Sequence, residues 1–183
     1  MSGRLGELWG TSPVVFWLVL AACAFFVVMA VRLAVIDIRE HRLPNRVIFP
    51  AYPAVAVLLL AAAVLHHLDG EALSLMPDGG AALFGIPGGR IVAGGAVLWI
   101  FYFLLRLIYP PGMGFGDVKL AGILGMYLGY LGWSHLAFAT FGAFLLGGLW
   151  GVALILARRG TLKSAIPFGP FMLLGAGAAM LLP

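Results

Sequence analysis

The sequence has very little charge. Of its 183 residues only 10% are Asp, Glu, Lys or Arg, while 63% are hydrophobic. A soluble globular domain has about a quarter charged residues, and a small sphere cannot hide this much apolar surface from water. A lipid bilayer accepts such a surface, provided that the backbone polar groups pair within the protein. The composition therefore excludes a soluble fold and predicts an all-α integral membrane protein.

Cysteine is almost absent as well. The single residue, Cys23, lies in an apolar run, which excludes a disulfide framework and a zinc site of the CxxC type. Acidic residues are fewer than basic ones, seven against eleven. In a membrane protein such an excess of Lys and Arg usually records topology, so we expect membrane lipids and no nucleic acid as partners.

What the sequence does contain is long apolar stretches. A helix needs about 20 residues to cross the hydrocarbon core, and stretches near this length predict a bundle of six transmembrane helices. They cover residues 14–36, 47–65, 91–109, 118–133, 136–157 and 166–182. So little remains between them that we expect one membrane-embedded domain, residues 1–183.

The basic residues gather at one end of this predicted bundle. When the loops alternate across the membrane, nine of the eleven Lys and Arg residues fall on one side, and only Arg4 and Arg90 on the other. Cytoplasmic loops of membrane proteins carry this excess. The sequence therefore predicts a cell-membrane protein with loops 37–46, 106–117 and 158–165 in the cytoplasm and both termini outside.

Two acidic residues approach the bilayer at the cytoplasmic end. Asp37 directly follows the first apolar stretch and Asp117 directly precedes the fourth, so both lie at a similar depth. Two neighbouring carboxylates resist double ionisation and hold one proton between them. The ionised one can activate water while the protonated one polarises a carbonyl. The pair thus predicts aspartic-protease chemistry if the two helices are neighbours.

Each aspartate alone has an ordinary explanation. Asp37, beside Arg39, could be a solvated loop residue, and an Asp that follows glycines at a helix start could be a cap. The flanking Gly114 and Gly116 would allow a tight turn and close approach of a substrate backbone. The start of a helix also favours an ionised carboxylate, which predicts Asp117 as the more easily ionised partner.

Three segments together resemble one family, the type IV prepilin peptidases. Residues 37–45 (DIREHRLPN) resemble its first aspartate motif, residues 114–120 (GFGDVKL) its GxGD motif, and residues 166–171 (IPFGPF) the segment that opens its last span. The resemblance implies that Asp37 and Asp117 are the catalytic pair. It implies cleavage of the basic leader of prepilin-like proteins after a glycine, at the cytoplasmic face, for type IV pili or related secretion systems. It implies no metal and no organic cofactor.

The sequence departs from the larger relatives at its N-terminal end. Those relatives carry a domain with paired CxxC motifs that binds zinc and methylates the new pilin N-terminus. No cysteine precedes the first apolar stretch here. We therefore expect peptidase activity without a zinc or methylase domain and without methyltransferase activity.

Several further residues are expected to shape the site or the bundle. Pro44 and Asn45 would form the turn that begins the second span. Lys119, on a different helix face from Asp117, could anchor topology, bind a lipid phosphate or contact the scissile carbonyl. The small-residue patterns at 125–129 and 147–151 suit close helix packing, inside the bundle or in a homodimer.

Other functions stay open at this point. A presenilin-like GxGD intramembrane protease would share the second motif, but the PN loop and the 166–171 segment speak against it. A small proton or ion transporter would place its acidic residues near the midplane with broken helices, and the sequence has neither feature. A scaffold without activity would tolerate conservative changes of the aspartates.

Overall fold

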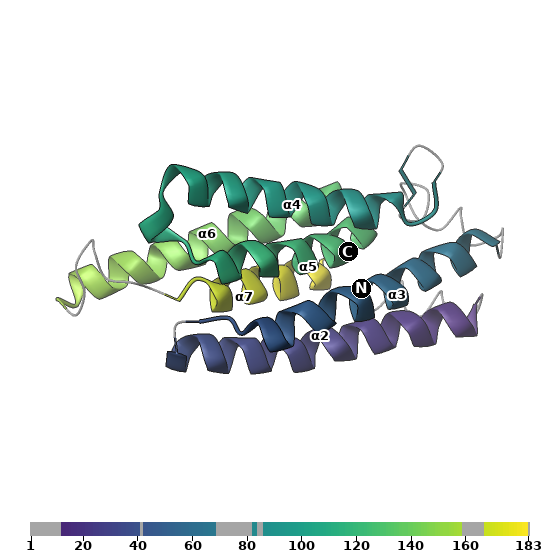
Figure 1. The fold of residues 1–183 in the computed structure, drawn as a ribbon, viewed down its shortest axis with the longest axis horizontal. Coiled ribbons are helices and arrows are strands. Elements are labelled where there is room, and N and C mark those ends of the chain that lie inside the picture. Colours follow the sequence, from purple (N-terminus) through teal and green to yellow (C-terminus); the bar gives the residue numbers. More distant parts are fainter. Residues whose placement is uncertain (1–11, 41, 69–81, 84–85, 159–166, 183) are drawn as a thin grey trace.

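A computed structural model describes residues 12–40, 42–68, 82–83, 86–158 and 167–182. His41 and Ile166, which belong to two of the motifs, lie outside the described residues, as do residues 1–11. The described chain folds into an elongated bundle of six α-helices (Figure 1). These are α2 (Pro13–Glu40), α3 (Asn45–Leu68), α4 (Gly89–Ile108), α5 (Phe115–Leu131), α6 (Trp133–Leu156) and α7 (Gly169–Leu181), with a short 3-10 helix η2 (Pro110–Gly112) before α5.

Four of the helices are long and apolar enough to cross a membrane, namely α2, α3, α4 and α6. This confirms the predicted all-α membrane class. The helices at the fourth and sixth predicted spans are shorter than these four: α5 has 17 residues and α7 has 13. At 1.5 Å per residue they are about 26 and 20 Å long, against about 30 Å of hydrocarbon. Gly132, with φ 137°, ends α5.

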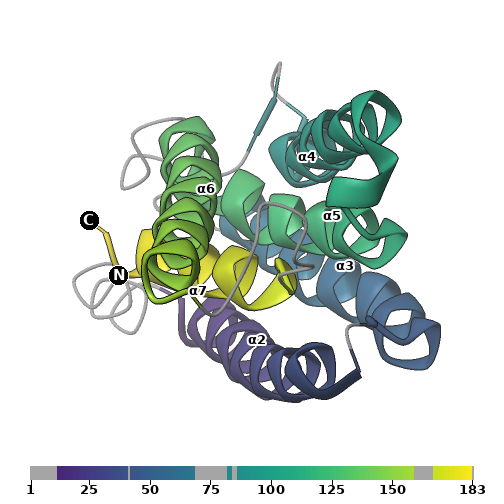
Figure 2. The same ribbon diagram turned by 90° about the vertical axis from the view of Figure 1, so that its left-hand side faces the viewer.

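Helix α5 lies at the centre of the bundle. Thirteen of its 17 residues are buried, and the view along the bundle shows α5 between α4 on one side and α3 and α7 on the other (Figure 2). A helix that is apolar all round is expected in such an interior position. By contrast, α6 buries only His135, Ala139 and Ala143 and leaves a broad apolar surface for lipid.

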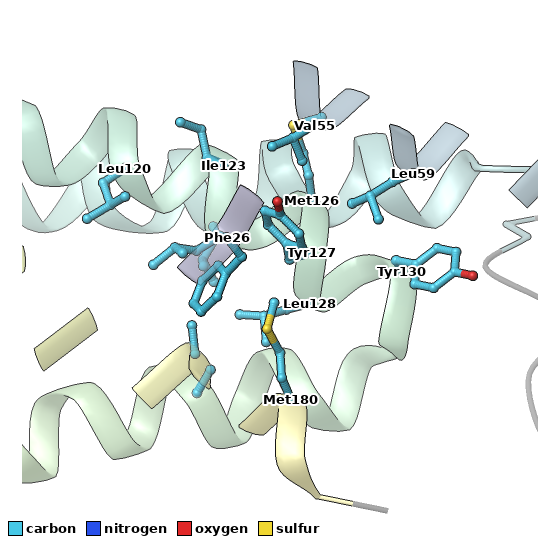
Figure 3. Close-up of a cluster of buried hydrophobic side chains, with 14 of the residues drawn as sticks. Phe26, Val55, Leu59, Leu120, Ile123, Met126, Tyr127, Leu128, Tyr130 and Met180 are labelled. Carbon is cyan, nitrogen blue, oxygen red and sulfur yellow. The ribbon is translucent and has the colours of Figure 1, made fainter. Parts of the chain in front are cut away.

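The core joins α2 to α5 through aromatic side chains (Figure 3). Tyr127 of α5 packs edge-on against Phe26 of α2, with ring centroids 5.3 Å apart. Its hydroxyl donates a hydrogen bond of 2.8 Å to the carbonyl oxygen of Ala22. A buried hydroxyl needs such a partner, so this bond helps to hold α5 beside α2.

Glycines bring α4 and α5 into backbone contact. A Cβ atom at Gly94 would lie 2.5 Å from the carbonyl oxygen of Gly125 and 2.9 Å from the Cα of Gly129. A Cβ atom at Gly125 would in turn overlap the Gly94 carbonyl. The predicted close packing at 125–129 is therefore packing inside the bundle, while a homodimer stays a prediction.

The structure corrects the predicted end of the first helix. The sequence prediction placed Asp37 in a loop, but α2 continues to Glu40. No glycine or proline interrupts the chain between Ile36 and Glu40, so nothing stops the helix there. The buried positions of α2 form a stripe with helical spacing. They are Val15, Val19, Ala22, Phe26, Met29, Leu33 and Asp37.

The glycine contact predicts a stability difference within the bundle. Gly125→Ala would force α4 and α5 apart, and overpacking of this kind lowers the free energy of unfolding by about 1–3 kcal/mol. Gly148→Ala is the matched control, because a Cβ there meets no atom within 4 Å apart from its chain neighbours and the nearby backbone of its own helix. Thermal unfolding of the purified variants should show a lower Tm for Gly125→Ala alone. Equal Tm values would contradict the packing argument.

Candidate active site

The two aspartates line one cavity at one end of the bundle. Asp37 comes from the last turns of α2 and Asp117 from the first turn of α5, and these two ends lie at the same end of the molecule (Figure 1). The cavity has a volume of about 250 Å³, and Arg42, Gly114 and Leu43 also line it. A water molecule occupies about 30 Å³ of liquid, so several waters or a short peptide segment would fit.

Both carboxylates are largely withdrawn from solvent. The exposed fraction is 5% for Asp37 and 7% for Asp117. The structure thus places the two residues in one cavity, and their role as a catalytic pair stays a prediction. The ordinary reading of Asp37 as a solvated loop residue does not fit its burial.

A local turn fixes the orientation of Asp117. The backbone N–H of Gly114 donates a hydrogen bond of 3.1 Å to Asp117 Oδ2, and the N–H of Asp117 donates one of 3.2 Å to the Gly114 carbonyl. Residues 114–117 therefore close on themselves at the helix start. Both glycines of the motif lie along the cavity wall, where they present backbone and no side chain.

Arg106 holds the segment that leads into this turn. Its guanidinium donates a hydrogen bond of 2.6 Å to the carbonyl oxygen of Met113 and lies 5.4 Å from the centroid of the Phe115 ring. From the sequence, Arg106 is only one of the basic residues that predict the topology. Its spacing alone does not show that its side chain folds back on the segment between α4 and α5.

Two glycines make close contacts at this end of the bundle, one with Asp37 and one with Leu43. A Cβ atom at Gly169, the first residue of α7, would lie 2.7 Å from Asp37 Oδ2. A Cβ atom at Gly116 would lie 2.7 Å from the Cβ of Leu43. Sequence reasoning did not select Gly169 or Leu43 as site residues, although both belong to motifs that it quoted. The signal for Gly169 was the IPFGPF segment, which the prediction used only to mark the last span.

Burial has the largest effect on the pKa of Asp117, which directly precedes the apolar stretch beginning at Val118. Loss of solvent raises the pKa of Asp117, and the nearby charge of Asp37 raises it further. The Gly114 N–H and the Arg106 charge act in the opposite direction and are weaker. The net direction is opposite to that expected from the helix start alone. Which aspartate ionises first stays a prediction.

The remaining predicted residues lie beside the cavity. The carbonyl oxygen of Pro44 accepts hydrogen bonds from Val47 and Ile48, at 3.1 and 3.3 Å, and so begins α3. Lys119 Nζ donates a hydrogen bond of 2.8 Å to Asn45 Oδ1. Neither Lys119 nor Asn45 lines the cavity. The structure therefore links these two residues to each other instead of placing them at the carboxylates.

The chemistry available to this arrangement is that of a carboxylate pair. Within the described residues no group of three or more His, Cys, Asp or Glu side chains could hold a metal ion. The ionisable side chains that line the cavity are those of Asp37, Asp117 and Arg42. One carboxylate can take up a proton while the other supplies one.

The fold and this cavity define a class: a multi-pass helical membrane protein with two buried aspartates in one pocket at the end of its bundle. The chain belongs to the type IV leader peptidase family, whose family model matches residues 23–152. That region contains both aspartates and ends before Gly169.

Curated relatives carry the name prepilin leader peptidase/N-methyltransferase. The protein from Aeromonas hydrophila is 34% identical over 166 residues, which cover 90% of this chain and 50% of the relative. The protein from Bacillus subtilis is 29% identical over 156 residues, which cover 85% of this chain and 53% of the relative. This chain thus spans about half the length of these relatives. No solved structure matches it.

The shared cavity predicts that the two carboxylates titrate together. Asp37→Asn removes a charge that raises the pKa of Asp117, so the pKa of Asp117 should fall in this variant. Infrared difference spectra of the carboxylic C=O stretch across pH can follow this group, and Asp117→Asn identifies its band. Glu40→Gln, at the exposed end of α2, is the control. Equal titration of all three proteins that retain Asp117 would disprove the coupling.

Proposed function

We propose that this chain is an aspartic endopeptidase in which Asp37 and Asp117 form the catalytic pair. The observation that carries the proposal is the burial of these two carboxylates in one cavity, in a chain of a leader peptidase family. Buried, coupled carboxylates are what general acid and base catalysis near neutral pH requires.

The proposed reaction is hydrolysis of one peptide bond. The ionised carboxylate accepts a proton from a water molecule in the cavity while the water oxygen attacks the scissile carbonyl carbon. The protonated partner donates its proton to the carbonyl oxygen, which gives a neutral tetrahedral diol. Collapse of this diol breaks the C–N bond. The leaving nitrogen takes up one proton, and the pair is left with one proton as at the start.

The walls of the cavity support a peptide as the substrate. Gly114 and Gly116 present backbone at the cavity, and Gly169 packs directly on the Asp37 carboxylate. Without side chains at these positions an extended peptide backbone can approach both carboxylates. The attacking water and the scissile peptide group could then lie within hydrogen-bond distance of the two carboxylates.

We propose prepilin-like proteins as the substrates, in line with the printed name of the curated relatives. The expected cut lies after a glycine at the end of a basic leader, just before an apolar helix. The excess of basic residues at this end of the bundle supports an active site that faces the cytoplasm. Both termini would then face outward. The proposal covers peptidase activity and not methyl transfer.

The position of the aspartates favours a peptidase over an ion transporter. Asp37 lies three residues before the end of α2 and Asp117 is the third residue of α5. Both are therefore near helix ends, whereas transporter sites lie near the midplane.

Mapping the cleaved bond would also separate a leader peptidase from a protease that cuts within a transmembrane helix.

Neutralising either aspartate should abolish cleavage. The purified protein is incubated with a candidate prepilin, and the shortened product is measured. Asp37→Asn and Asp117→Asn should each lower kcat by about 100-fold to 10,000-fold, because each removes one half of the proton transfer. Glu40→Gln should cleave at the normal rate.

The pH dependence gives a further check on the same pair. Activity needs one proton on the two carboxylates, so it should fall at low pH, when both are protonated, and at high pH, when neither is. If either Asn variant cleaves at the normal rate, the assignment of the pair is wrong.

Gly169 should matter for activity although it has no side chain. The added methyl group of Gly169→Ala would displace the Asp37 carboxylate, and a misplacement of about 1 Å can cost about 100-fold in rate. Gly177→Ala, on the same helix, meets only an ordinary contact of 3.8 Å with Phe26 and should retain activity. Equal rates for the two variants would show that α7 does not position Asp37.

A further inference from the structure

One side-chain contact joins the two chain segments that carry the aspartates. Lys119 Nζ donates a hydrogen bond of 2.8 Å to Asn45 Oδ1. Asn45 is the first residue of α3 and follows Asp37 by eight residues, whereas Lys119 follows Asp117 by two. The bond therefore links the start of α5 to the chain that continues from the end of α2.

Lys119 itself does not reach the cavity. Side chains two residues apart on a helix point to different faces, and Lys119 is not among the residues that line the cavity beside Asp117. A direct contact between its ammonium group and a scissile carbonyl at the carboxylates is not supported by this geometry. Any effect of Lys119 on the reaction must pass through the position of Asp117.

Two aromatic rings hold the ammonium group in place. Lys119 Nζ lies 4.8 Å from the ring centroid of Phe49 and 4.9 Å from that of Phe115. Ammonium groups are attracted to aromatic faces at such distances. Phe49 belongs to α3 and Phe115 to α5, so the same ammonium group binds both helices. A basic residue that served only as a topology anchor would need none of these contacts.

The backbone of Lys119 is tied to α3 as well. The hydroxyl of Tyr52 donates a hydrogen bond of 2.6 Å to the Lys119 carbonyl oxygen. A Cβ atom at Gly122 would overlap this hydroxyl, so the surface of α5 is open at the point where Tyr52 enters. The main chain and the side chain of Lys119 thus contact the same neighbouring helix.

We propose that Lys119 and Asn45 form a positioning latch that holds the first turn of α5 against the start of α3 and thereby sets the approach of Asp117 to Asp37. The connection between α2 and α3 supports this role, because Leu43 packs on Gly116 of the same α5 turn. The activity test of the latch rests on the proposed peptidase function.

Opening the latch should alter the electrostatics of the pair. The charged groups that face Asp117 are Asp37 on α2, Arg42 in the connection to α3, and Arg106 on α4. If α5 moves away from α3, Asp117 moves away from Asp37 and gains contact with water. The pKa of Asp117 then falls, and the alkaline limb of the kcat profile shifts to lower pH.

The test compares four variants in the cleavage assay. Lys119→Met and Asn45→Ala should each lower kcat by about tenfold, change KM by less than about twofold, and shift the alkaline limb to lower pH. The double variant should be no slower than the slower single variant, because both changes break one contact. Asn45→Asp keeps an acceptor for the ammonium group and should retain more activity than Asn45→Ala.

Arg46→Met is the matched control. Arg46 adjoins Asn45 and is exposed, so this variant removes a positive charge from the same end of the bundle but leaves the latch intact. It should keep the normal kcat and pH profile. An equal loss in Arg46→Met would overturn the latch in favour of a general effect of charge.

Other outcomes would also overturn the proposal. A folded Lys119→Met protein with normal kcat and pH profile would do so. A double variant whose loss of kcat equals the product of the two single losses would do so as well. If Lys119→Met is not recovered folded, Asn45→Ala carries the test, because it shortens an exposed side chain. The infrared titration of Asp117 supplies a readout without substrate. A lower pKa in Asn45→Ala would support the latch even if Asp37→Asn and Asp117→Asn showed that the proposed function is wrong.

Discussion

Repulsion between two buried carboxylates is the constraint that the rest of this structure must satisfy. Asp37 and Asp117 are each more than nine-tenths buried, and like charges in such a place oppose each other. Packing must therefore hold them together. The buried stripe of α2 fixes Asp37, and the Gly114 turn at the start of α5 fixes Asp117. Contacts with the remaining helices fix the positions of these two helix ends.

Many of the contacts that fix these positions are made by small residues. Gly94 and Gly125 let α4 and α5 touch through their backbones, and Gly169 lets α7 begin against the Asp37 carboxylate. Between membrane helices, where lipid is as apolar as a leucine side chain, such close contacts supply the packing that hydrophobic burial supplies in water. These glycines are thus part of how the cavity with the two aspartates is built.

Sequence reasoning predicted the class of the fold and five of the six helix positions closely, because apolar length is a local property. It also selected both aspartates that line the cavity, since charge is rare in such a chain. It failed where the answer depended on contacts between distant segments. No residue between Ile36 and Glu40 breaks α2, and Asp37 continues its buried stripe, but the neighbours that bury this stripe are not visible in the sequence. Gly169 contacts the Asp37 carboxylate only after folding brings α7 to the end of α2.

The short, enclosed helix α5 also affects how the protein responds to its bilayer. Every residue from Leu120 to Tyr130 is buried, so this part of α5 has no surface in contact with lipid. Membranes differ in hydrocarbon thickness, and helices that face lipid adapt to the mismatch by tilting. Here the outer helices meet the lipid, while the helix that carries Asp117 meets protein. The position of Asp117 is therefore shielded from hydrophobic mismatch, whereas Asp37 lies on α2, whose exposed Val27, Val28 and Val31 meet the lipid. A change in membrane thickness that tilts α2 would act on the carboxylate pair through Asp37.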